Sequence, residues 1–236
     1  MKSLKYILLL LAVLSAVPSF AQTDEEWKPV GVWPFVNRKF QVATVYTGVF
    51  TRSKTIVPCN IHVGKQTLWY SQNDTLMEAL PGTVLRVEFA GGDTYMPVGR
   101  EQRFGRIVRE DSIGGTIARI ICVQVLNQRE LDQKYLDYIN KTQNMLQGMG
   151  GAMDATLSAI ADNDAGIRME EEPLPLYNEF YFQVKGEIFP ATTKNILARI
   201  NPKRKGEYRN FTRSAEIIST SEKSMQKIWK EFFLKW

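Results

Sequence analysis

The residues best able to support chemistry in this 236-residue chain are one histidine, two cysteines and a scatter of carboxylates. A nucleophilic site of the Ser-His-Asp or Cys-His type would have to be built on His62, the only histidine. It lies in Asn60-Ile61-His62-Val63, a strand-like pattern in which histidine is more often packed than catalytic. Zinc sites normally need several His or Cys ligands, so this composition predicts no metal site.

Other motifs of catalytic type are incomplete. Ser224-Met225-Gln226-Lys227 matches the Ser-x-x-Lys signature of serine acyl-enzymes, but the partner motifs Ser-Asp-Asn and Lys-Thr-Gly do not occur in the sequence. Residues 162–166 begin like a calcium loop, yet Gly166 and Pro173 stand where an EF-hand needs ligands. The glycine pairs lack the spacing of phosphate-binding loops. We therefore expect no catalytic residue and no cofactor.

One enzymatic alternative stays open. A hydrolase that uses only carboxylates, such as a glycosidase, needs neither histidine nor cysteine. Glu88, Glu110 and Asp111 are candidate acids, but no spacing singles out a pair among them.

The first residues have the pattern of a secretory signal peptide. Lys2 and Lys5 precede an apolar run over residues 7–17, and Ser19 and Ala21 place small residues at −3 and −1 before Gln22. The apolar run is about half the 20 residues that a membrane-spanning helix needs. We expect residues 1–21 to be removed, which leaves an exported, periplasmic or extracellular protein without a transmembrane segment.

Export would bring Cys59 and Cys122 into an oxidising compartment, where a disulfide is permitted. For a loop of this size, the loop-entropy model gives a bridge about 4 kcal/mol of stabilisation. The alternative is two buried thiols that pack as small apolar side chains. Each cysteine lies in a run typical of a β-strand, and the sequence does not show whether those strands are neighbours.

The elements that must position these residues divide into a strand-rich part and a helix-rich part. Short runs of period two with turn residues between them predict an antiparallel β-sandwich or small barrel over about residues 33–126. Residues 110–111 are expected in a turn. Leu85, Val87 and Phe89 alternate with polar residues and are expected to share one buried face of a strand. The expected strands cover residues 39–50, 55–63, 67–71, 76–79, 85–89, 102–109 and 116–126, the last being the most central.

Helical spacing follows, so the expected fold class is α+β. Residues 128–147 carry one apolar stripe, and the residues up to 175 form an acidic linker after a further helical turn or two. The C-terminal part, residues 176–236, is expected to hold a strand and then helices. The expected organisation is thus a signal peptide (1–21), a β-rich domain (22–127), a helical segment with its linker (128–175) and a basic C-terminal part (176–236).

The last helix carries the clearest pattern. Ser219 and Glu222 fit a capping box, and apolar residues follow at i, i+3, i+4, i+7 and i+11. We expect this stripe to be core, with docking onto a partner as the alternative. Its members are Met225, Ile228, Trp229, Phe232 and Trp236.

The strand at residues 181–189, the stretch Ala191-Thr192-Thr193-Lys194-Asn195-Ile196-Leu197, a basic turn and the capped aromatic helix resemble the ends of uncharacterised secreted proteins of Gram-negative bacteria. Leu68-Trp69-Tyr70 and residues 74–79 are similar to β-hairpins of such proteins. The resemblance implies secretion and a β-domain followed by a helical tail, with no known activity.

Charge is uneven along the chain. Residues 192–236 hold eleven basic and four acidic residues, whereas the rest of the mature chain is net acidic. A basic turn interleaved with Tyr208 and Phe211 is a candidate site for an anion or partner, and its alternative is a solvated face. Its members are Lys203, Arg204, Lys205, Arg209 and Arg213.

Thr75 and Ser112 follow an aspartate and precede an aliphatic residue, as in the sequon of some bacterial O-glycosylation systems, and both are expected in hairpin turns. Taken together, the sequence predicts an exported non-enzymatic binding protein of the bacterial envelope. Its expected partner is another envelope protein or an anionic glycan, and not nucleic acid. Its oligomeric state is left open.

Overall fold

The computed structural model of the chain describes residues 35–48, 52–73, 75–80, 82–148 and 174–234. The expected signal peptide (1–21), most of the acidic linker and Trp236 lie outside the described residues. The strands are β1 (Gln41–Thr47), β2 (Ser53–His62), β3 (Thr67–Gln72), β4 (Thr75–Glu78), β5 (Val84–Phe89), β6 (Thr94–Val98), β7 (Arg103–Ile113), β8 (Thr116–Leu126), β9 (Leu176–Val184) and β10 (Glu187–Pro190). The helices are α2 (Gln128–Gly148), α4 (Thr193–Arg199), the 3-10 turn η1 (Pro202–Arg204), α5 (Lys205–Ser214) and α6 (Glu222–Phe232).

All ten strands belong to one antiparallel sheet in the order β10-β9-β8-β7-β6-β5-β1-β2-β3-β4. The expected α+β class with an antiparallel sheet is therefore confirmed, and the sheet is not closed. β9 follows the helical segment along the chain but pairs with β8, so the sheet is built from both sides of that segment.

Strands β1 to β7 curl around a core of their own. Val45, Ile61, Val87 and Phe89 are buried there, together with Leu68 from β3 and Phe104 from β7. The side-chain amide of Gln66, in the turn between β2 and β3, donates hydrogen bonds to the carbonyls of Val63 and Gln124. This amide fastens the β2–β3 turn to the end of β8 and helps to hold the curl.

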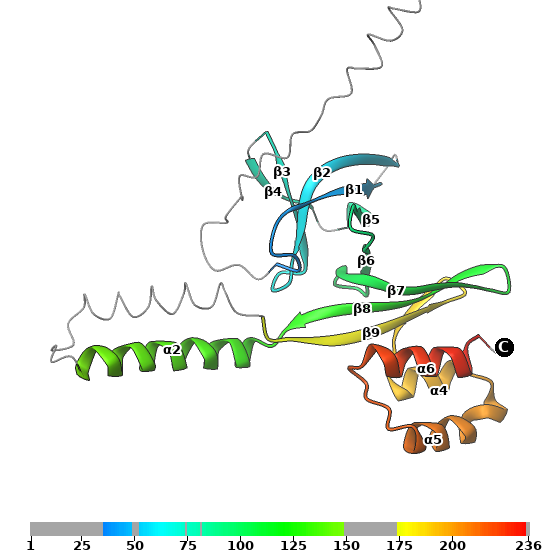
Figure 1. The fold of residues 1–236 in the computed structure, drawn as a ribbon. Helices are drawn as coiled ribbons and strands as arrows, with labels where there is room; N and C mark the ends of the chain where they lie inside the picture. The colour runs from blue at the N-terminus through cyan, green and yellow to red at the C-terminus, as the bar shows by residue number, and fades with distance from the viewer. Residues whose placement is uncertain (1–34, 49–51, 74, 81, 149–173, 235–236) are drawn as a thin grey trace, which may run out of the picture.

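The other part of the sheet, β7 to β10, carries helices on one face, as Figure 1 shows. Ile120 and Cys122 of β8 face a core shared with α4, α5 and α6, whereas Ile121 and Val123 belong to a separate cluster with Tyr181. β8 is thus buried on both faces, as its apolar run predicts.

Helix α2 leaves the end of β8 and extends away from the sheet (Figure 1). Its 21 residues span about 31 Å at 1.5 Å per residue. Among the described helices, none combines the length and the apolarity that crossing a membrane requires.

The apolar stripe of α6 is core. Met225, Ile228, Trp229 and Phe232 are each at most 1% exposed. The Trp229 ring lies edge-on to Phe182 of β9 and stacks on Phe233. Its indole N–H donates to Asp111 Oδ2 at 2.8 Å, which joins α6 to the end of β7.

Several local expectations were wrong. Residues 110–111 continue β7 instead of forming a turn, and the basic stretch 205–214 is helix α5. β6 was not expected, and the single strand expected at residues 181–189 is divided by a turn into the end of β9 and β10. α6 is capped by Ser221, whose Oγ accepts from the Ser224 N–H, so the serine that caps the helix stands two residues after Ser219. Thr192 caps α4, since its hydroxyl oxygen accepts from the Asn195 N–H.

Cys59 and Cys122 are not bridged in the structure, contrary to the disulfide alternative. Cys59 lies in β2 within the curled core, and Cys122 lies in β8 within the core under the helices. Four strands stand between β2 and β8 in the sheet, and the two thiols pack in different clusters. Burial raises the pKa of Cys59 to about 12 and that of Cys122 to about 11, so both remain thiols.

The burial of Trp229 leads to a stability prediction. Trp229→Ala should lower the free energy of unfolding by about 3–5 kcal/mol, because a large aromatic side chain leaves a packed core. Chemical denaturation of both proteins measures the difference. Lys227→Ala on the exposed face of the same helix is the matched control and should stay within about 0.5 kcal/mol of the parent. Equal effects of the two substitutions would contradict the packing.

The cysteines lead to a second prediction. The native protein should resist a thiol-labelling reagent, because both sulfurs are buried. After denaturation without any reductant, two thiols per chain should react. A denatured, unreduced protein with no reactive thiol would show that a bridge had formed.

Candidate functional site

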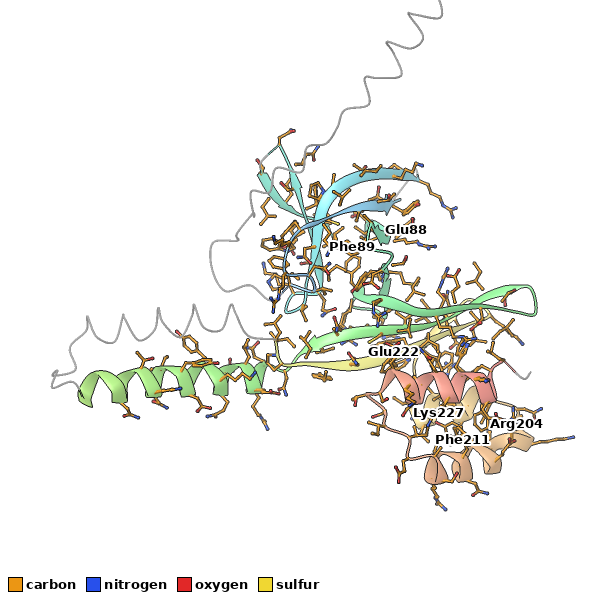
Figure 2. The ribbon with its side chains drawn as sticks, viewed as in Figure 1. Glu88, Phe89, Arg204, Phe211, Glu222 and Lys227 are labelled. Atoms are coloured by element: carbon orange, nitrogen blue, oxygen red, sulfur yellow. The ribbon has the colours of Figure 1, made fainter. Side chains whose placement is uncertain are left out.

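The outer faces of α5 and α6 carry rows of cations. Lys205, Arg209 and Arg213 follow one another at i, i+4 and i+8, so they share one side of α5. This side lies away from Tyr208, which is buried. Lys223, Lys227 and Lys230 are exposed on the side of α6 opposite its buried stripe. Figure 2 labels Lys227 on that helix.

The acidic residues of these helices are held by the protein's own arginines. Arg204 pairs with Glu207 at 2.8 Å and with Glu231 at 3.3 Å. Arg106, on β7, pairs with Glu222 at 2.8 Å. These carboxylates therefore neutralise arginines at the edges of the helices and not the cations of the outer rows.

Arg204 is a structural residue and does not belong to the surface site that the sequence suggested. Its guanidinium lies 4.7 Å from the centre of the Phe232 ring, and Nη1 donates to the backbone carbonyl of Glu231 at 2.9 Å. The two aromatic side chains of the predicted patch face the core and not the surface, since Tyr208 and Phe211 both pack edge-on against Phe232. No aromatic ring of α5 is thus offered to a ligand.

Seven lysines and arginines of η1, α5 and α6 have no carboxylate within ion-pair distance in the part of the chain that the structure describes. Three of them, on α6, were not assigned to the site from sequence. The uneven charge of the C-terminal part was the available signal, but assigning the lysines required knowing where Glu222 and Glu231 are held. The seven are Lys203, Lys205, Arg209, Arg213, Lys223, Lys227 and Lys230.

Such a surface can attract anions. Clustered cations of one sign raise the local potential and concentrate anionic partners, and arginine guanidinium groups match carboxylate and phosphate geometry. Exposed lysines and arginines tolerate varied partners because their side chains are long and mobile. The surface is therefore better suited to an extended polyanion than to one small molecule.

The candidate acids of the hydrolase alternative are each bound by an arginine. Arg86 contacts Glu88 at 2.8 Å, Arg119 contacts Glu110 at 2.6 Å, and Arg109 contacts Asp111 at 2.6 Å. The hydrogen bond from Arg109 lowers the pKa of Asp111, with help from the Trp229 indole. Asp111 therefore remains a carboxylate, which disqualifies it as a general acid. No group of three metal-ligating side chains occurs among the described residues.

His62 packs as its strand context predicts. Its Nδ1 accepts from the Lys65 backbone N–H at 3.0 Å, and its ring lies against Phe35 and Trp69. Burial lowers the pKa of this imidazole, so it is neutral at physiological pH.

The two candidate glycosylation residues are both exposed but differ in place. Thr75 was expected in the turn itself but is the first residue of β4, directly after the turn, where it pairs with Gln72. Ser112 lies inside β7 and pairs with Ile117, so it was wrongly placed in a turn.

Comparison of the chain with protein-family models, with curated proteins and with solved structures finds no match.

Proposed function

We propose that the chain is an exported, non-enzymatic binding protein of the bacterial envelope that holds an anionic glycan on the outer faces of α5 and α6. The observation that carries this proposal is the separation of charge in the C-terminal helices. Their glutamates Glu207, Glu222 and Glu231 are bound inward by Arg204 and Arg106, while the cations of the outer rows face solvent without carboxylate partners among the described residues.

The scaffold suits such a role. Helix α6 is anchored by Trp229 and Phe232 in a core shared with β8 and β9, so the rows stand on a rigid base. We also interpret the curled part of the sheet as a small barrel, because β3 approaches β7 across the Leu68 and Phe104 side chains. In this proposal the barrel and the helices are two modules on one sheet.

The role of the rows is tested by a charge variant. Replacing Arg209, Arg213, Lys223 and Lys227 by glutamine should weaken binding to dextran sulfate about tenfold at low salt, because polyanion binding depends on released counterions. Neutral dextran should bind neither protein. Isothermal titration at two salt concentrations measures both.

A control variant separates the rows from net charge. Arg38, Lys54, Arg100 and Arg129 are exposed cations outside the C-terminal helices, and their replacement by glutamine removes the same charge. This control should retain most of the affinity. An equal loss in the two variants would contradict a site on α5 and α6. Binding of an envelope protein, but of no polyanion, would replace the glycan by a protein partner.

Export has its own test. Expression of the full chain in a Gram-negative host should give an envelope fraction whose mass corresponds to a protein that begins at Gln22, because a signal peptidase recognises the small residues Ser19 and Ala21. Intact-mass spectrometry reads the N-terminus directly. An uncleaved N-terminus in exported material would contradict the expected signal peptide.

A further inference from the structure

A hollow of about 640 Å³ lies between the curled part of the sheet and β8. One side is formed by β1, β5 and the start of β2, and the other side by β8. Its lining residues are Tyr46, Thr47, Arg52, Ser53, Leu85, Arg86, Glu88, Ile117 and Arg119. The volume is within the range usual for small-molecule sites, about 300–1,000 Å³.

A β-bulge places an apolar side chain in this hollow. The pairing of β1 with β5 shifts between Tyr46 and Thr47, so that Thr47 faces Val84. Val84 is therefore buried at 4% exposure, and Leu85 points outward at 42% exposure. Alternation from Val87 and Phe89 alone would have put Leu85 in the core. Bulges commonly re-aim side chains next to functional sites.

The approach of the backbone to Leu85 is close. A Cβ atom at Gly48 would lie 3.1 Å from Leu85 Cδ1, so a larger residue there would push against the leucine. Ile117 of β8, 53% exposed, adds a second apolar side chain to the same hollow. The lining thus combines two aliphatic side chains with a largely polar surround.

Two of the three arginines in the lining are fixed in position. The Arg86 guanidinium lies 2.8 Å from Glu88, which also accepts from the Tyr46 hydroxyl at 2.9 Å. Arg119 donates to Glu110 at 2.6 Å and to Gln183 at 2.8 Å. Figure 2 shows Glu88 beside Phe89, and their burial places them on opposite faces of β5.

Arg52 is the exposed cation of the hollow. Within the described residues it has no carboxylate within ion-pair distance. Glu88 is the one carboxylate among the lining residues, against three guanidinium groups. The lining therefore has an excess of positive charge next to two aliphatic side chains.

We propose that this hollow binds an aliphatic carboxylate, with the carboxylate on Arg52 and the hydrocarbon part across Leu85 and Ile117. Arginine binds carboxylates through two parallel hydrogen bonds, and burial of the hydrocarbon stabilises the complex further. Two sources share this chemistry: a fatty acid, and the last residue of a peptide that ends in an apolar side chain. The site is separate from the cationic rows and does not depend on their function.

The probes are octanoate and N-acetyl-leucine, titrated into the mature protein and followed by two-dimensional NMR. We expect at least one of them to shift the amide signals of Thr47, Leu85 and Ile117. Tighter binding of octanoate would indicate a fatty acid, and tighter binding of N-acetyl-leucine would indicate the last residue of a peptide. Octylamine, with the opposite charge, should not bind. Absence of binding by both carboxylates, or equal binding of octylamine, would overturn the proposal.

Variants localise the binding. Arg52→Gln and Leu85→Asn should each raise the dissociation constant of the more tightly bound probe about tenfold. Arg100→Gln and Leu80→Asn are the matched controls, since Arg100 is exposed and Leu80 is 73% exposed, and neither lines the hollow. Equal affinities of Arg52→Gln and the parent protein would overturn the assignment. Dextran sulfate binding should not change in these variants. A loss of carboxylate binding can therefore be told apart from a failure of the glycan proposal.

Discussion

The two-sided burial of β8 is the constraint on which the rest of the structure depends. Ile120 and Cys122 require a cover on one face, and Ile121 and Val123 require one on the other. The C-terminal helices supply the first cover through Trp229 and Phe232. The neighbouring strand must also approach closely, since a Cβ at Gly105 of β7 would lie 2.4 Å from Ile121. A strand that is apolar on both faces cannot leave either face exposed to water. The helices therefore cover one face of β8, and the curled part of the sheet covers the other through Val98 of β6.

This cover determines where charge remains. Because α6 packs on the sheet through its apolar stripe, its flanking glutamates lie near Arg106 and Arg204 and pair with them. Such partly exposed pairs contribute little stability individually. Their larger effect is on the surface, because each glutamate that turns inward leaves a lysine or arginine of the outer rows without a neutralising partner. The anionic partner that we propose thus follows from the way the core is closed.

Periodicity in the sequence was sufficient for elements whose burial is set by their own residues. β8, α2 and the stripe of α6 were all predicted in this way. Elements that depend on distant partners were not. α5 has few apolar residues and a glycine in its first turn, and its packing rests on Phe232 of another helix. The exposure of Leu85 follows from a bulge in the pairing with β1, and the structural role of Arg204 depends on Glu231, 27 residues away. Neither partner can be identified from the local pattern.

The open edges of the sheet bear on which kind of binding the fold permits. β2 pairs with β3 only from Cys59 onward, so its first half has β1 on one side alone among the described strands. That half contains Lys54 and Pro58, residues that discourage the addition of another strand. The terminal strands β4 and β10 have four residues each, and β10 ends in Pro190. Short or proline-bearing edges offer little backbone for pairing, so binding through an added strand is disfavoured. The binding that we propose therefore relies on side chains, those of the helical rows and those of the hollow beside the bulge.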